Sequence, residues 1–348
     1  MIYAMAPMQN AQTDRIMSKN IANVRLEDLP PPPAGKFGWP WTEASSLIPE
    51  KPFPGQEWPR ISIVTPSYNQ GAFIEETIRS VLLQNYPHLE YIVMDGGSSD
   101  STQEILERYR PWISQVVSKP DHGQSDAIAS GFQSAHGDIL AWLCSDDLYL
   151  KGALVWAARK FLENPSIDLV CAETRLDQGR GWEEWMAFRY VNSTPTYAKL
   201  IACGQTARQP GCFWTKRAYL KTPGVDRSLV YCMDYDLLMK LCSVGAAQYW
   251  DHEIAWLRSH QASKSSTMPS IHSRERRMIL EKALSTTDKS RLYLCALAYV
   301  NRGRNILNFP RTRWYAKAWN LGRLAGSLLY RFLRGDALRW HPIDGFGD

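Results

Sequence analysis

The sequence predicts an α/β fold built on a mostly parallel β-sheet with helices on both faces. From residue 61 onward, short apolar runs alternate with longer amphipathic segments, and this alternation is typical of strand-helix-strand units. In such sheets ligands bind beyond the carboxyl ends of the strands. Residues that follow the predicted strands are therefore the first candidates for chemistry.

Five short apolar runs are predicted strands, at residues 61–64, 91–94, 113–117, 139–143 and 167–172. A helix is expected from Ile74 to Leu82, because apolar residues recur there at helical spacing. Ser101 and Glu104 form a capping-box pattern that begins the next predicted helix. Further helices are expected at 124–135 and 152–163, between the later strands.

Composition and charge restrict the class of protein. The chain has 348 residues, 45% hydrophobic and 22% charged, which is typical of a globular protein and excludes collagen-like or disordered chains. The net charge is +5. Residues 302–339 carry nine Arg or Lys against the single Asp336, a net +8, so the remainder carries −3.

Cysteine usage and hydropathy predict a cytoplasmic protein. The seven cysteines are far apart and form no CxxC pair, so reduced thiols are favoured over a zinc site or a disulfide set. The N-terminus lacks the basic start and long apolar stretch of a secretory signal. No uninterrupted apolar run reaches the ~20 residues that cross a bilayer. Contact with the inner face of the membrane remains open.

Small, polar or acidic residues follow three of the predicted strands, in the segments 65–69, 95–100 and 145–147. Neither GxGxxG nor GxxxxGK[ST] is present, so a dinucleotide fingerprint and a P-loop are excluded. The adjacent carboxylates of Asp146 and Asp147 suit a hard cation such as Mg²⁺ or Mn²⁺. Taken alone, the Ser-Asp-Asp sequence is a weak signal for a metal and is explained better by turn chemistry.

Together these segments resemble family 2 glycosyltransferases of the GT-A fold. The resemblance runs through IVTPSYNQGAFIEETIRSVLLQNYPHLEYIVMDGGSSDST and KPDHGQSDAIASGFQSAHGDILAWLCSDD, and more loosely through 209–214, 233–236 and 258–260. It implies inverting transfer of a sugar from a nucleotide diphosphate-sugar to an acceptor hydroxyl, with a divalent cation, Mn²⁺ or Mg²⁺. A glycan or lipid-linked acceptor in polysaccharide or glycoconjugate biosynthesis is expected.

The resemblance also assigns site residues. Asp234 matches the general base, while Asp147 and His260 match metal-binding positions. The positions that match the nucleotide-sugar site are Thr65, Pro66, Ser67, Tyr68, Asp95, Gly96, Ser98, Asp126 and Asp146.

Structural interpretations stay open beside these roles. Asp234 stands at the start of a predicted helix, Tyr235 to Cys242, where a carboxylate can serve as a cap. His260 can be a satisfied surface histidine. Ser98 and Asp100 can shape a turn. Gln209-Pro210 can contact the acceptor or end a strand.

Two departures from the family pattern bear on function. Relatives usually carry Asn-Lys in the helix after Gly123, where this chain has Ala129 and Ser130, so a basic side chain near the diphosphate is missing. The QxxRW motif of processive synthases is also absent. A sugar nucleotidyltransferase and a catalytically silent nucleotide-sugar binding protein are the alternative functions.

Three regions are predicted: a Pro/Trp-rich arm (1–60), a catalytic domain (61–265) and a helical basic extension (266–348). As a helix, residues 313–334 would carry a basic face opposite an apolar one. Through residues 311–334, such a helix would either contact an anionic membrane surface or pack on the catalytic domain. Nucleic-acid binding is not expected, because the remaining chain is acidic and carries no recognition motif.

Overall fold

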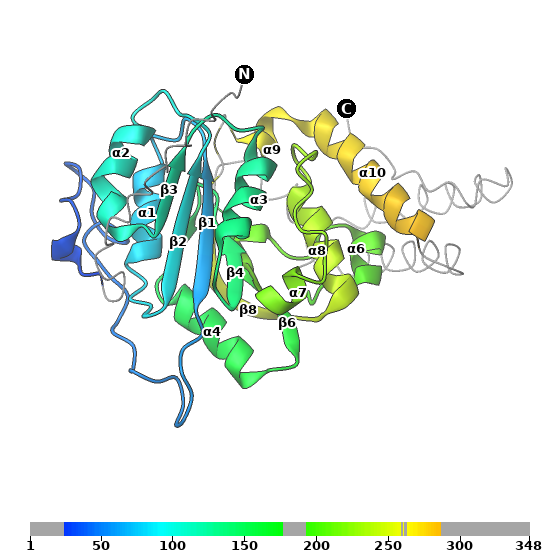
Figure 1. Ribbon diagram of the computed structural model, residues 1–348, viewed down its shortest axis with the longest axis horizontal. Helices are drawn as coiled ribbons and strands as arrows, with labels where there is room; N and C mark the ends of the chain where they lie inside the picture. The colour runs from blue at the N-terminus through cyan, green and yellow to red at the C-terminus, as the bar shows by residue number, and fades with distance from the viewer. Residues whose placement is uncertain (1–23, 177–192, 259, 261–262, 287–348) are drawn as a thin grey trace, which may run out of the picture.

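The computed structural model describes residues 24–176, 193–258, 260 and 263–286, which form a sheet covered by helices (Figure 1). Within this part of the chain the strand order is β3-β2-β1-β4-β7-β6-β8-β5. The strands are β1 (Ile61–Ser67), β2 (Leu89–Asp95), β3 (Gln115–Ser118), β4 (Ile139–Trp142), β5 (Leu148–Tyr149), β6 (Ile167–Leu176), β7 (Cys212–Thr215) and β8 (Ala246–Leu257).

The first four strands are all parallel, with β1 between β2 and β4 and with β3 outside β2. β6 and β8 also pair in parallel, whereas β7 and β5 run antiparallel to their neighbours. The five predicted strands correspond to β1, β2, β3, β4 and β6, and β8, which was not predicted, pairs in parallel with β6. The mostly parallel α/β fold is confirmed, and the short strands β5 and β7 add an antiparallel component.

The helices are α1 (Ile74–Leu82), α2 (Thr102–Tyr109), α3 (Gln124–Ser134), α4 (Ala153–Glu163), α6 (Tyr197–Cys203), α7 (Lys216–Tyr219), α8 (Met233–Val244), α9 (Lys264–Thr267) and α10 (Pro269–Thr286). Short 3₁₀ helices lie at η1 (Leu26–Asp28), η2 (Arg110–Trp112) and η3 (Gln209–Gly211).

Two separate hydrophobic clusters show that helices cover both faces of the sheet. Ile63 of β1 packs in one cluster with α1, α2 and α4. The next residue, Val64, packs in the other with α3, α6, α8 and α10. Successive side chains of a strand point to opposite faces. The near-continuous apolar runs of β1 and β2 therefore contribute side chains to both clusters.

The described part of the N-terminal arm, residues 24–60, is hydrogen-bonded to the face of the molecule that carries α1. Arg79 of α1 is 1% exposed and donates hydrogen bonds to the carbonyls of Pro30 (2.8 Å), Pro40 (3.0 Å) and Trp41 (2.9 Å). The Trp39 indole donates to the Tyr149 carbonyl (2.9 Å). Through these contacts residues 30–41 pack against the main body. A buried guanidinium needs such partners, because an unpaired buried charge is costly.

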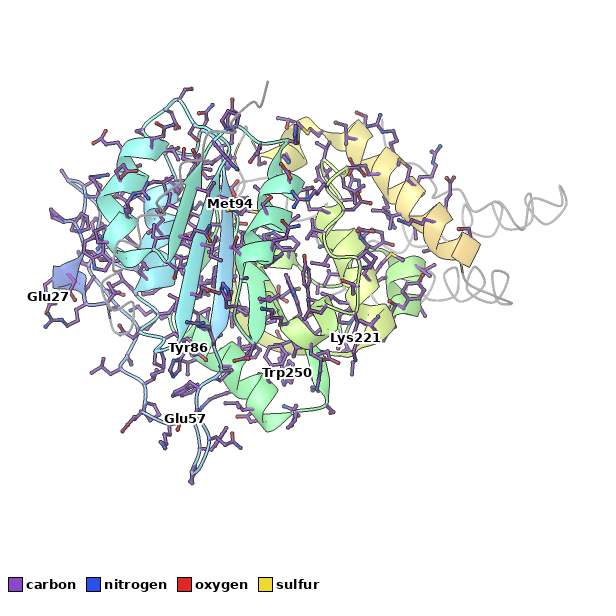
Figure 2. All side chains as sticks on the ribbon, viewed as in Figure 1. Glu27, Glu57, Tyr86, Met94, Lys221 and Trp250 are labelled. Atoms are coloured by element: carbon purple, nitrogen blue, oxygen red, sulfur yellow. The ribbon has the colours of Figure 1, made fainter. Side chains whose placement is uncertain are left out.

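The carboxyl ends of the parallel strands lie at one end of the sheet. In Figure 2, Met94 near the end of β2 lies at the top, while Tyr86, before β2, lies at the opposite end, as do Trp250 and Lys221. Ser67 and Asp95, the last residues of β1 and β2, pair in register. The candidate segments after β1, β2 and β4 therefore meet at the upper end of the molecule in this view.

α10 lies within the extension 266–348, which the sequence predicts to be helical. The predictions for residues 1–23 and 313–334 fall outside the described residues. Among the residues that are described, no helix is both long and apolar enough to cross a membrane.

Candidate functional site

The turn after β2 is organised around Asp95. This carboxylate is 2% exposed and accepts hydrogen bonds from the Ser98 backbone N–H (3.0 Å), the Ser98 hydroxyl and the Ser118 hydroxyl (2.6 Å). Because an ionised carboxylate offers about four acceptor positions, these bonds leave room for one further donor. Asp95 therefore shapes the turn and keeps acceptor capacity for a ligand.

The turn after β1 is joined to the turn after β2. The Ser98 hydroxyl accepts from the Asn69 N–H (2.7 Å), and the Asn69 side chain accepts from the Ser99 N–H (2.9 Å). Asp100 accepts from the Gly71 N–H (2.8 Å) and caps α2 through the Thr102 N–H (3.0 Å). Ser98 and Asp100 thus have the turn-shaping role that the sequence left open.

Four residues at and just after the end of β1 match the nucleotide-sugar site, and they differ in exposure. Thr65 is fully buried and accepts from the Tyr91 hydroxyl (3.1 Å), which places its side chain within the sheet, and Pro66 is buried as well. Ser67 is 6% exposed, and its hydroxyl has no hydrogen-bond partner among the residues that the structure describes. Tyr68 is 62% exposed, so its ring is available to a flat ligand at the sheet end.

Asp121, in the loop before α3, lies close to Gly96 in the turn after β2. A Cβ atom at Gly96 would lie 3.1 Å from a carboxylate oxygen of Asp121. Since this distance is tighter than ordinary contact, a side chain at Gly96 would displace Asp121. The glycine therefore lets the turn after β2 and the loop before α3 approach closely.

The turn after β4 holds the predicted metal-binding pair. The Thr77 hydroxyl of α1 lies 2.9 Å from the Ser145 carbonyl and 2.8 Å from the Asp147 carbonyl and fixes the turn. The Asp147 side chain is 5% exposed and accepts from the Arg258 N–H (3.1 Å). Burial, reinforced by the neighbouring Asp146, raises the pKa of Asp147 well above its usual range.

His260 meets the same turn from the segment after β8. Its Nε2 lies 3.0 Å from an Asp146 oxygen, and its ring packs on Phe73 with a centroid distance of 4.6 Å. Arg258 lies over the same ring and forms an ion pair with Glu76 (3.0 Å). His260 thus contacts the turn through Asp146, and the carboxylate oxygens of this turn suit Mn²⁺ or Mg²⁺. A divalent cation would also favour the ionised form of buried Asp147.

Cys144 belongs to this cluster, although the sequence favoured an ordinary core thiol. Its sulfur and one oxygen each of Asp146 and Asp147 lie within 4.8 Å of one another. The Gln124 amide donates to the sulfur (3.2 Å). Burial raises the pKa of Cys144, and the charges of Asp147, Asp146 and Asp234 add to this increase while Lys264 opposes it. Cys144 therefore lies among the carboxylates of the site.

Asp234 lies in the first turn of α8 and is partly buried. The Gln205 amide donates to one carboxylate oxygen and the Tyr235 N–H to the other, both at 2.7 Å. Burial raises the pKa of Asp234, and these two hydrogen bonds oppose the increase. A carboxylate with a raised pKa is a better proton acceptor, while its bond to Tyr235 also agrees with a role at the helix start.

Glu275 of α10 fixes the turn before α8. This carboxylate is 3% exposed and accepts from the consecutive N–H groups of Val230 (2.7 Å), Tyr231 (2.9 Å) and Cys232 (2.8 Å). Helix N-termini present unpaired N–H groups and favour negative charge. Glu275 thereby holds the start of the helix that carries Asp234.

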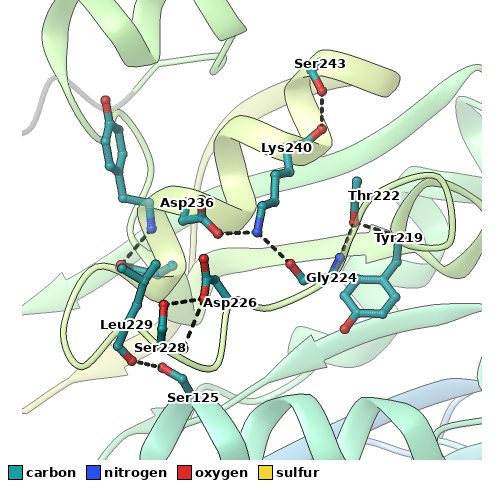
Figure 3. A network of polar contacts seen from close by, with 12 residues as sticks. Ser125, Tyr219, Thr222, Gly224, Asp226, Ser228, Leu229, Asp236, Lys240 and Ser243 are labelled. Carbon is teal, nitrogen blue, oxygen red and sulfur yellow. Dashed lines mark hydrogen bonds and ion pairs between the residues drawn. The ribbon is translucent and has the colours of Figure 1, made fainter. Parts of the chain in front are cut away.

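The loop 224–232 is further attached to α3 and α8 (Figure 3). The Ser125 hydroxyl donates to the Leu229 carbonyl, and Lys240 of α8 donates to the Gly224 carbonyl (2.9 Å) while pairing with Asp236. Arg227 of this loop forms an ion pair with Asp126 and donates to the Ser130 hydroxyl (2.9 Å). A basic group from the loop therefore occupies the position beside Ser130, where the helix itself has none.

The structure brings most predicted residues to one end of the sheet but gives some of them internal roles. Asp126 is used by Arg227 and by the His122 N–H (3.1 Å). Gln209 is buried and donates to the Trp142 carbonyl (2.7 Å), which supports its interpretation as a strand-end turn.

Sequence reasoning missed Cys144, Gln205, Glu275 and Lys264. Lys264 follows His260 closely in the chain, so its position could have suggested a role. Gln205 and Glu275 carry no local pattern, because they contact Asp234 and its turn only through the tertiary fold.

Comparisons with known proteins agree with this architecture. The model of the family described as "Glycosyl transferase family 2" matches residues 62–222. An uncharacterized glycosyltransferase of Rickettsia typhi is 28% identical over 224 residues, which cover 60% of this chain and 67% of that protein.

Two solved structures are similar in fold at 17% sequence identity and a TM-score of 0.54. One is S. aureus TarS 1-349 in complex with UDP-GlcNAc, where the match covers 70% of this chain and 72% of that one. The other is the mannosyltransferase PcManGT from Pyrobaculum calidifontis in complex with GDP-Man and Mn²⁺, with 84% and 79% covered. The GT-A type fold predicted from the sequence is thereby confirmed.

Proposed function

Because this chain belongs to glycosyl transferase family 2 through residues 62–222, we propose that it transfers a sugar from a nucleotide diphosphate-sugar to an acceptor hydroxyl with inversion. The reaction would serve assembly of a glycan, polysaccharide or glycoconjugate. The observation that supports it best is the carboxylate pair Asp146-Asp147 after β4, which clusters with the Cys144 sulfur within 4.8 Å, while the charge of Asp234 at the start of α8 helps to raise the pKa of Cys144.

The nucleoside would bind across the ends of β1 and β2. Tyr68 offers an exposed ring for the base, and Asp95 retains acceptor capacity for a ring N–H. The unpartnered hydroxyl of Ser67 lies on the residue paired with Asp95. Buried polar groups are normally hydrogen-bonded, so this hydroxyl is suited to a ligand. Donors bound by the two structural relatives, UDP-GlcNAc and GDP-Man, are of the proposed class.

Asp147 and His260 would hold a divalent cation, with Asp146 beside them. Mn²⁺ accompanies the donor in the mannosyltransferase of similar fold. When bound, such a cation supplies positive charge that stabilises the departing diphosphate. The hard carboxylate oxygens favour Mn²⁺ or Mg²⁺ over softer metals, although the Cys144 sulfur lies close by.

Asp234 would act as the general base. Its carboxylate accepts the proton of the acceptor hydroxyl while the new C–O bond forms at the anomeric carbon. The bond from that carbon to the diphosphate oxygen breaks, and the nucleoside diphosphate leaves with the bonding electrons. Attack opposite to the leaving group inverts the anomeric configuration. The partly buried position and raised pKa of Asp234 support this role.

The test is incubation of the full chain with Mn²⁺, a panel of nucleotide-sugars and candidate acceptors, with measurement of nucleoside diphosphate release. Release that depends on acceptor and metal is expected. Pyrophosphate release would indicate a sugar nucleotidyltransferase instead. Donor binding without turnover across all acceptors would indicate a silent binding protein, and either result would contradict the proposal.

The basic segment 311–334, outside the described residues, is proposed to contact an anionic membrane surface at the cytoplasmic face. The surrounding residues 302–339 contain nine basic residues and one acidic residue, and this excess of positive charge supports the proposal. Flotation with anionic liposomes should be lost when residues 311–348 are deleted. Equal flotation of both chains would contradict it.

A further inference from the structure

Lys264 is a partly buried cation whose local partners do not neutralise it. It is the first residue of α9, shortly after His260. Its Nζ donates to the Val230 carbonyl (2.9 Å), which is its one hydrogen-bond partner among the described residues. Within the same part of the chain it forms no ion pair with a carboxylate. An ammonium has three donors, so two of them are free for a ligand.

The surroundings of Lys264 are those of the candidate site. Burial lowers the pKa of Lys264, while the nearby charges of Cys144, Glu275, Asp146 and Asp121 oppose the decrease. Two of these residues, Cys144 and Asp146, belong to the turn after β4. Another of the four, Asp121, lies beside Gly96, just after β2. Lys264 is therefore near both the metal-binding turn and the turn after β2.

Two arginines close to this site have acidic partners. Arg258 pairs with Glu76, and Arg227 pairs with Asp126. Lys264 differs from them because its partner is a neutral carbonyl. Removing a charged group from water without an opposite charge is costly, and an anionic ligand would offset that cost.

We propose that Lys264 binds the diphosphate of the nucleotide donor, with its ammonium contacting a phosphate oxygen on the side of the site formed by α9. The inference rests on the proposed function, because the diphosphate is the donor's. The position of Lys264 is set from both sides: it donates to Val230, and the N–H of Val230 is held by Glu275. Lys264 is thus placed by the same turn that precedes Asp234.

The experiment compares binding of nucleoside diphosphates and of the corresponding uncharged nucleosides, by calorimetry with Mn²⁺, in the full chain and its variants. Lys264→Met keeps the length of the side chain and removes the charge. We expect diphosphate affinity to fall about 10- to 100-fold, as for loss of one charged hydrogen bond, with nucleoside affinity unchanged. Lys264→Arg should retain most of the diphosphate affinity.

Lys221→Ala is the matched control. Lys221 is an exposed lysine at the end of the sheet opposite Met94 (Figure 2), so its removal should leave both affinities unchanged. Wild-type-like diphosphate affinity in Lys264→Met would overturn the assignment. If wild-type protein binds no nucleoside diphosphate at all, the proposed function itself fails, which is a distinguishable outcome.

A second measurement needs no variant and so does not depend on folding of Lys264→Met. Wild-type protein is treated with an amine-acylating reagent, and labelling of each lysine is followed by mass spectrometry. Nucleoside diphosphate with Mn²⁺ should protect Lys264 and leave Lys221 labelled, whereas nucleoside alone should protect neither. Equal labelling of Lys264 with and without a diphosphate that binds would overturn the proposal.

Discussion

The turns after β1, β2 and β4 and the turn that carries Asp234 are stabilised in different ways. Asp95 is held by Ser98, three residues away, and by Ser118 on the adjacent strand. Asp234 is held by Gln205, 29 positions away, and the preceding turn is held by Glu275 of α10. Most contacts of the first region are therefore made among residues 65–147, whereas the second also depends on the packing of α10.

The family match follows the same division. It covers residues 62–222 and so includes both Asp95 and the Asp146-Asp147 pair, but it ends before Asp234. In the proposed reaction the first region binds the donor and the second activates the acceptor. Substitutions in the two regions should therefore separate binding from transfer, and the comparison can be tested on that basis.

The largest effect is expected from Asp234→Asn, which keeps the shape of the side chain and removes the base. Transfer should fall by about 10²- to 10⁴-fold, the usual contribution of positioned acid-base catalysis, with donor affinity retained. Initial rates and calorimetry with donor measure the two quantities. Asp251→Asn, at an exposed position on β8, is the matched control. Parallel loss of binding and transfer would show that Asp234 belongs to the donor region.

Asp147→Asn should have the opposite signature. Loss of a residue that only supports a metal ligand lowers metal affinity about 10- to 100-fold. Loss of the ligand Asp147 itself should lower it at least as much, and metal-dependent donor binding should fall with it. Titration with Mn²⁺, followed by donor binding at each concentration, measures this. If Asp147→Asn transfers sugar at the wild-type rate at the metal concentration that wild type needs, Asp147 is not a metal ligand.

Glu275→Ala tests the long-range support of the second region. Its removal leaves three N–H groups before α8 without their acceptor. The free energy of unfolding should fall by about 1–3 kcal/mol, the cost of unsatisfied buried polar groups, and kcat should fall more than donor affinity. Denaturant unfolding and steady-state kinetics measure these changes. Glu281→Ala, at an exposed position on the same helix, is the control. An equal loss of stability and kcat in this variant would mean that Glu275 does not specifically support the turn before α8.

The strands and helices of the first region could be predicted because their signals are local. The apolar runs of β1, β2 and β4 and the spacing of Ile74 and Ile78 reflect burial within single elements. β5, β7 and β8 were not predicted. Leu148–Tyr149 and Cys212–Thr215 are short, and all three strands are defined by pairing with distant parts of the chain. Of the site, Asp95, Asp146 and Asp147 follow strands and were recognisable. Glu275 and Gln205 were not, because nothing adjacent in sequence indicates which N–H or carboxylate they will meet.

The smallest expected effect is a change of pH dependence in Gln205→Ala. The base must be ionised to accept a proton, so the rate falls as the pH drops through the pKa of Asp234, which burial already raises. The Gln205 hydrogen bond favours the ionised form, and its loss raises this pKa further. The acid limb of kcat/KM, measured at saturating Mn²⁺, should therefore move to higher pH with an unchanged rate at alkaline pH. Ser118→Ala, which removes a hydrogen bond to Asp95 in the first region, should weaken donor binding and leave that limb in place. Identical limbs in Gln205→Ala and wild type would mean that the titrating base lies elsewhere, and the division between the two regions would have to be redrawn around it.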